Sequence, residues 1–158
     1  EFRARALMRR MNVEIVCTTD DPVDSLEFHK ELAGSGCHTK VYPTWRPDKL
    51  LAIDNPSNFN SYISKLEEVS DINILSYEEL LEALQKRHDL FESHGCVLSD
   101  HGLDRFYAEP YTEQEIEAIF MKVRMGKMAD SIETDKFRSA ILYELAKMDA
   151  RSGWAQQF

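Results

Sequence analysis

The chain of 158 residues is long enough for one domain with a hydrophobic core, and its 43% hydrophobic and 30% charged residues are ordinary for a globular protein. Its net charge of −9 disfavours a nucleic-acid partner, because the phosphate groups of that partner would be repelled. No apolar run approaches the roughly 20 residues of a membrane-spanning helix and no signal peptide opens the chain, so we expect a cytoplasmic protein with no membrane partner.

The first part of the chain predicts two helices and two strands in alternation. In chain order they are a helix at 2–11, a strand at 13–18, a helix from about 20 to 33 and a strand at 39–45. Asp20 and Asp21 precede Pro22, and an acidic N-cap followed by proline is typical of a helix start. We therefore place the start of the second helix there.

The middle of the chain predicts a small helical insertion at about 54–95, before the third strand at 96–99. Apolar residues recur with helical spacing at 59–69, and again after Ser76. Ser76 and Glu79 have the spacing of a capping box, in which each side chain bonds the other residue's backbone N–H.

The last part predicts two more helices and a fourth strand. Thr112 and Glu115 form another predicted capping box, a long helix follows at about 132–151, and a strand is predicted at 154–158. Strands that alternate with helices indicate a parallel α/β fold. Because the sequence ends inside a predicted strand, we expect the chain to be an internal part of a longer protein.

The three cysteines, Cys17, Cys37 and Cys96, are widely spaced and contain no C-x-x-C pair. This spacing argues against a disulfide framework and a structural zinc site. Each cysteine lies within or beside an apolar segment, so we expect three buried free thiols.

Polar residues follow three of the predicted strands at the point where each strand ends. The junctions are residues 18–22, 45–48 and 99–102, which contain acidic side chains, a guanidinium group and an imidazole. Functional groups of parallel α/β folds gather at the carboxyl ends of the strands. We therefore expect Arg46 and Asp100 to project into a common site.

Each of these residues also has a commoner structural role. Arg46 can hold a carboxylate with two parallel hydrogen bonds, but a salt bridge to Asp48 is the more frequent arrangement. Asp100 is a candidate general acid or base, and the equal alternative is a cap or turn aspartate. His101 is more often a packed histidine than a base or ligand. Four nearby residues could hold Arg46 and Asp100 in place without binding the substrate themselves. They are Trp45, Asp48, His101 and Asp20.

Three ordered motifs give the sequence a resemblance to a known family. They are residues 17–26 (CTTDDPVDSL), 43–49 (PTWRPDK) and 98–102 (LSDHG), and the similarity continues through 143–146 and 153–154 to the last residue. In this order they resemble the uronate isomerases of the amidohydrolase superfamily.

The resemblance implies an aldose–ketose isomerase that interconverts D-glucuronate with D-fructuronate, and D-galacturonate with D-tagaturonate. It implies a (β/α)8 TIM barrel, of which this chain would supply about half, strands two to five. Arg46 would grip the carboxylate of the hexuronate, and Asp100 would take part in moving a proton between C2 and C1. The divalent metal of the family, with zinc favoured, would be held by residues outside 1–158, and a homo-oligomer is left open.

Two alternatives come from the residues themselves. One is a small α/β module that binds carboxylates or sugar acids through Arg46. The other is an assembly domain that pairs with another chain through open sheet edges. Because the metal-binding strands of the resembled family are missing, we expect residues 1–158 alone to be inactive.

Overall fold

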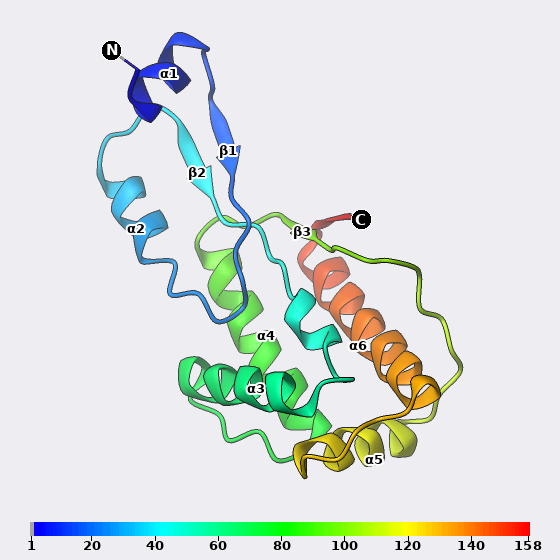
Figure 1. The fold of residues 1–158 in the computed structure, drawn as a ribbon. Coiled ribbons are helices and arrows are strands. Elements are labelled where there is room, and N and C mark those ends of the chain that lie inside the picture. Colours follow the sequence, from blue (N-terminus) through cyan, green and yellow to red (C-terminus); the bar gives the residue numbers. More distant parts are fainter. Residues whose placement is uncertain (1) are drawn as a thin grey trace.

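The computed structural model describes residues 2–158 and shows an α/β fold in which short parallel strands are interspersed with helices (Figure 1). The elements are α1 (Ala4–Arg10), β1 (Ile15–Cys17), α2 (Glu27–Gly34), β2 (Lys40–Tyr42), the 3-10 helix η1 (Asp48–Leu51), α3 (Pro56–Ser70), α4 (Tyr77–Ser93), β3 (Leu98–Asp100), α5 (Glu113–Arg124), α6 (Ser131–Ser152) and β4 (Ala155–Gln157). All four predicted strands are present, each shorter than the pattern suggested.

The four strands form two parallel pairs that Trp45 links. β1 pairs with β2, and β3 pairs with β4. Trp45 makes a parallel bridge to Asp20 on one side and to Ser99 on the other. The strands therefore follow one another in space in their order along the chain, which is the usual outcome when successive strands are joined by helical crossovers.

Helices α3, α4, α5 and α6, together with η1, pack on one another and hold most of the buried apolar residues; we call them the helical cluster. Phe59 of α3 is fully buried, and its ring meets the rings of Phe120 and Phe137 edge-on at centroid distances of 6.2 and 5.7 Å. Edge-to-face contacts add to the free energy gained from apolar burial. The two helices of the predicted insertion thus share their core with α5 and α6.

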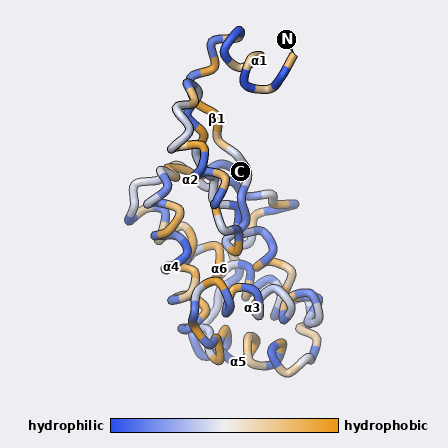
Figure 2. The backbone as a smooth tube through the Cα atoms, turned by 90° about the vertical axis from the view of Figure 1, so that its left-hand side faces the viewer, coloured by the Kyte–Doolittle hydropathy of each residue, from blue (hydrophilic) through white to orange (hydrophobic). Residues whose placement is uncertain are grey.

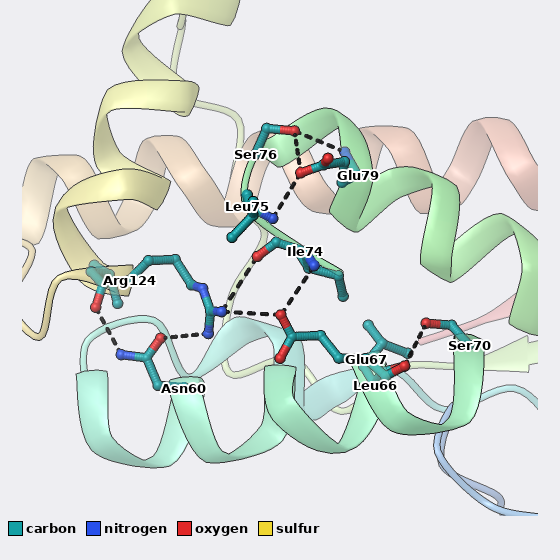
Figure 3. A network of polar contacts seen from close by, with 10 residues as sticks. Asn60, Leu66, Glu67, Ser70, Ile74, Leu75, Ser76, Glu79 and Arg124 are labelled. Carbon is teal, nitrogen blue, oxygen red and sulfur yellow. Dashed lines mark hydrogen bonds and ion pairs between the residues drawn. The ribbon is translucent and has the colours of Figure 1, made fainter. Parts of the chain in front are cut away.

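A polar network ties the end of α5 to α3 and to the segment before α4 (Figure 3). Arg124 donates to the side-chain oxygens of Asn60 and Glu67 at 3.0 and 3.2 Å, and to the carbonyl of Ile74 at 3.3 Å. Asn60 donates in turn to the carbonyl of Val123 at 2.9 Å. The guanidinium group thereby joins two side chains of α3 to the loop carbonyl of Ile74, while Asn60 satisfies the helix-end carbonyl of Val123.

The predicted helix starts at Ser76 and Thr112 are confirmed. Thr112 and Glu115 form a complete capping box at α5. At α4 the Ser76 hydroxyl accepts from the backbone N–H of Glu79, whereas the Glu79 carboxylate accepts from Leu75 N–H at 2.7 Å. The arrangement at α4 therefore differs from a standard capping box, because Glu79 bonds the N–H of Leu75 and not that of the N-cap residue Ser76.

Residues 2–42, which contain α1, β1, α2 and β2, form an N-terminal arm. Neither α1 nor α2 contains a buried residue, and α2 packs on β2. Figures 1 and 2 show α1 at the end of the arm that lies away from the helical cluster. The arm thus contributes little to the core.

The predicted start of the second helix was wrong. Residues 21–24 form a turn in which Asp21 accepts from Val23 N–H, and α2 begins only at Glu27. Tertiary contacts hold this turn: Arg87 of α4 donates to the carbonyls of Pro22 and Asp24 at 2.7 and 2.6 Å. A buried guanidinium that needs acceptors has outweighed the local helix-start signal.

The expectation of three buried thiols was also wrong in part. All three cysteines are free, but only Cys96 is buried, where burial raises the pKa of its thiol to about 11. Cys37 is half-buried and Cys17 is exposed. Cys17 lies on β1, which only β2 flanks in the described part of the chain, so an apolar sequence there has no partner to cover it.

Across residues 2–158, none of the helices combines the length and the apolar character that a membrane crossing requires.

Candidate functional site

The site is set by the way the chain passes from β2 to η1 beside β3. The N–H of Trp45 donates to the carbonyl of Leu98 at 3.3 Å, and the N–H of Asp100 donates to the carbonyl of Trp45 at 2.9 Å. In parallel pairing, neighbouring residues in register point to the same side. The side chains of residues 46 and 100 therefore lie next to each other and point to the same side.

The side chains of Arg46 and Asp100 meet at this edge. Nη1 of Arg46 lies 3.1 Å from Oδ2 of Asp100, and Nε of Arg46 lies 2.8 Å from Oδ2 of Asp48. The three side chains are 39%, 23% and 27% exposed, in the order Arg46, Asp100, Asp48, so solvent reaches all of them. The predicted proximity of Arg46 and Asp100 is confirmed, and so is the salt bridge to Asp48.

The two carboxylates reinforce the positive charge of Arg46. The hydrogen bond and the charge of Asp48, followed by the charge of Asp100, raise the pKa of the guanidinium above its usual value. Asp48 and Asp100 occupy two N–H groups of the five that an arginine carries. Among residues 2–158, no further side chain bonds this guanidinium, which leaves donors for an external anion.

The residues that alternate with these two point the other way. Trp45 is fully buried and packs edge-on against Phe91 of α4 at 5.0 Å. Ser99 is fully buried and donates to Asp149 of α6 at 2.7 Å. The two-residue period of a strand thus puts Trp45 and Ser99 against the helices, and Arg46 and Asp100 on the open side.

His101 belongs to the helix-facing set. Its Nε2 lies 3.0 Å from the Ser99 hydroxyl, and its ring stacks on Phe158 at 5.2 Å. Burial lowers the pKa of this imidazole and outweighs the nearby carboxylates, so His101 is neutral near pH 7. Its imidazole contacts Ser99 and Phe158, and its backbone N–H donates to the carbonyl of Gln157 at 2.9 Å.

Asp20 fastens the ends of β1 and β2 to each other. Its carboxylate accepts from the Thr18 hydroxyl at 2.6 Å and from the N–H of Thr44 at 3.2 Å, and its carbonyl accepts from the N–H of Arg46 at 2.9 Å. Asp20 therefore acts on the backbone that carries Arg46, and not on the guanidinium group.

Sequence reasoning missed a buried polar network centred on Asp149 of α6. The Asp149 carboxylate accepts from the Ser99 hydroxyl and from Gln156, and lies 3.0 Å from Nε2 of His88. Burial alone would raise the pKa of Asp149, but the bonds from these partners outweigh it and lower the pKa below its usual value. No spacing rule could pair Asp149 with Ser99 and His88, which lie 50 and 61 residues away in the sequence.

A hollow of about 340 Å³ borders the site. Its lining includes Asp48, Gly102, Tyr107 and Arg138. A second hollow, of about 900 Å³, lies over α4, α5 and α6 and contains none of the candidate site residues. Both hollows fall in the size range of small-molecule sites, and the smaller one is lined by Asp48, the partner of Arg46, but by neither Arg46 nor Asp100.

Within 2–158, no group of three or more His, Cys, Asp or Glu side chains is arranged to hold a metal ion. The divalent metal implied by the resemblance therefore stays a prediction about residues elsewhere in the protein.

Comparison with known proteins gives concordant matches over the whole chain. Uronate isomerases of Bacteroides fragilis and Bacteroides thetaiotaomicron are 53% and 51% identical over 158 residues, which is 100% of this chain and 34% of each relative. The crystal structure of uronate isomerase from Thermotoga maritima superposes with a TM-score of 0.92 at 32% identity, over 96% of this chain and 34% of that one. That of glucuronate isomerase from Caulobacter crescentus gives 0.88 at 30% identity, over 98% and 32%.

The chain thus spans about a third of the length of the relatives it matches. The profile of the glucuronate isomerase family matches residues 1–158, and the predicted resemblance is confirmed. On this evidence the chain belongs to the glucuronate isomerase family.

Proposed function

We propose that the protein containing residues 1–158 is a uronate isomerase that interconverts D-glucuronate with D-fructuronate, and D-galacturonate with D-tagaturonate. The printed names of the relatives support the activity. The parallel order of β1 to β4, with helices between them, supports a place as strands two to five of a (β/α)8 barrel.

The observation that carries the proposal is the pairing of Arg46 with Asp100 on the open side of the strands, at 3.1 Å. A hexuronate needs an anion clamp, and Arg46 keeps N–H donors for a carboxylate beyond those that Asp48 and Asp100 occupy. The isomerisation also needs a positioned group that moves a proton, and Asp100, at the end of β3, is a carboxylate next to that clamp.

In the proposed reaction, the Asp100 carboxylate takes part in transferring a proton between C2 and C1. The C2–H bond of the aldose breaks, a C1–H bond forms, and the hydroxyl proton on C2 passes to the oxygen on C1, so that no oxidant is consumed. The developing enediolate needs electrostatic stabilisation, which is the chemistry that a divalent metal supplies when bound.

The partner we propose is a small hexuronate in a cytoplasmic setting, with neither nucleic acid nor membrane required. The net charge of −9 agrees with the first exclusion. A homo-oligomer is compatible with this proposal.

Activity of the protein that contains residues 1–158 tests the proposal. The rate of ketose formation from glucuronate should fall at least about 100-fold in Asp100→Asn, because positioned acid–base groups contribute about 10²–10⁴ in rate. Arg46→Ala should raise KM strongly, and far-UV circular dichroism should show an intact fold for both. No ketose from the unaltered protein would refute the function, and unaltered rates in Asp100→Asn would remove Asp100 from the mechanism.

A deuterium-exchange experiment tests whether Asp100 acts on the hydrogen at C2. In D2O the unaltered protein should exchange the hydrogen at C2, and Asp100→Asn should not. If the variant still exchanges that hydrogen, Asp100 acts elsewhere on the sugar. Residues 1–158 by themselves are expected to show no turnover in the same assay.

A further inference from the structure

Asp48 holds a position that the helical cluster fixes. It is the first residue of η1, which packs on α3 and α6, and Leu50 within the same turn is fully buried. Pro47, between Arg46 and Asp48, is buried as well. The Asp48 carboxylate is therefore presented by a rigid turn and not by a free loop.

That carboxylate connects both strand ends of the site. Its Oδ2 accepts from Nε of Arg46 at 2.8 Å, and its two oxygens accept from the backbone N–H of Gly102 at 3.1 and 3.2 Å. A bond to Nε fixes the plane of a guanidinium group, because Nε lies within that plane. Asp48 thereby directs the terminal nitrogens of Arg46 toward Asp100 and the open side.

Gly102 leaves the space in which the guanidinium lies. A Cβ atom at this position would lie 2.8 Å from Nη2 of Arg46 and 3.0 Å from Oδ2 of Asp48. Non-bonded heavy atoms pack at about 3.5 Å, so a side chain at this position would push the ends of Arg46 and Asp48 away from their present positions.

We propose that Asp48 and Gly102 form a positioning clamp for Arg46, which sets the affinity of the site for the carboxylate end of its hexuronate substrate. The proposal rests on the proposed function. Neither residue touches the reacting carbons: Asp48 acts by orienting the guanidinium, and Gly102 acts by leaving room for it. Disturbing the clamp should weaken substrate binding far more than it slows the proton transfer.

Steady-state kinetics of the protein containing residues 1–158 test the clamp. Asp48→Asn keeps the shape of the side chain but removes its charge. Because hydrogen bonds between charged groups are stronger than those between neutral groups, the variant should raise KM for glucuronate about tenfold or more. Its kcat should change by less than about threefold, because Asp48 does not touch the reacting carbons. Gly102→Ala should raise KM in the same way. The uncharged methyl ester of glucuronate should lose much less affinity than glucuronate itself in both variants.

Asp135→Asn is the matched control. Asp135 pairs with Arg105 at 2.5 Å, so the same substitution breaks an arginine–aspartate pair outside the site. This variant should leave KM and kcat unchanged. Thermal unfolding of all variants separates loss of fold from loss of binding, and Asp48→Asn alone decides the matter if Gly102→Ala does not fold.

The outcomes separate this inference from the function on which it rests. An inactive unaltered protein, or an Arg46→Ala variant with unchanged KM, refutes the proposed role of Arg46. If Arg46→Ala loses affinity while Asp48→Asn and Gly102→Ala stay within about twofold of the unaltered KM, the clamp is refuted and the function stands. A fall in kcat with unchanged KM in Asp48→Asn also overturns the clamp.

Discussion

The helical cluster and the N-terminal arm differ in how they are stabilised. The cluster buries large apolar side chains on every helix from α3 to α6, whereas α1 and α2 bury none. Apolar burial is the main favourable contribution to folding, so the cluster should hold most of the free energy of unfolding. The candidate site lies where the two regions meet: the Arg46 guanidinium is held from η1 and β3, and the arm bonds only the backbone of Arg46, through Asp20.

The largest expected contrast is between two phenylalanines. Phe59→Ala in α3 should lower the free energy of unfolding by about 3–5 kcal/mol, because it leaves a cavity among packed rings. Phe28→Ala in α2 should change it by less than about 0.5 kcal/mol, because Phe28 is 68% exposed. Urea unfolding of the purified chain measures both values. Equal losses would show that the arm is as important to stability as the cluster.

Asp149→Asn tests whether the buried network of Asp149 stabilises the packing of β3 on the helical cluster. Removing the charge should cost about 2–3 kcal/mol at neutral pH, because hydrogen bonds to a charged acceptor are strong. The pKa of Asp149 is lower in the folded state than its ordinary value of 3.8, so its contribution is present above that value and is lost as the pH falls through the folded pKa.

The difference in stability between Asp149→Asn and the unaltered chain should therefore be largest at neutral pH and should shrink below about pH 3.8. Urea unfolding at a series of pH values measures it. A difference that stays constant down to about pH 2 would mean that the charge of Asp149 does not stabilise the fold.

The smallest contrast compares two glycines. Gly153 ends α6 with a φ of 69°, in the left-handed region, and Gly153→Ala should cost about 1–2 kcal/mol although no atom lies within 4 Å of the added Cβ. Gly34, the last residue of α2, has the same open space without a positive φ. Gly34→Ala should gain up to about 1 kcal/mol, since it restricts only the unfolded chain. Shifts of the same sign in thermal unfolding would contradict the backbone explanation.

The sequence predicted the parts of the fold that depend on local signals. The helix starts at Ser76 and Thr112 and the alternation of strands with helices follow from residues close together in the chain, and the structure confirms them, with a full capping box at Thr112 only. The convergence of Arg46 and Asp100 was also predictable, because parallel strands bring their carboxyl ends together.

The features that failed or were missed depend on distant residues. The helix start at Asp20 and Asp21 was overridden by Arg87, and the network of Asp149 joins residues from α4, β3 and α6. The same holds for the space that Gly102 leaves. In each case a tertiary contact decides the outcome, and no local pattern in the sequence reports it.

The chain has only two tryptophans, and both lie at the junction of strands and helices. His88 sits between them, edge-on to Trp45 at 5.5 Å and stacked on Trp154 at 3.7 Å. Tryptophan emission therefore responds to solvent entering that junction, whereas far-ultraviolet dichroism responds to the helices wherever they are. Recording both signals during one denaturant titration would show whether the junction opens before, with or after the unfolding of the helices. No added fluorescent label is needed.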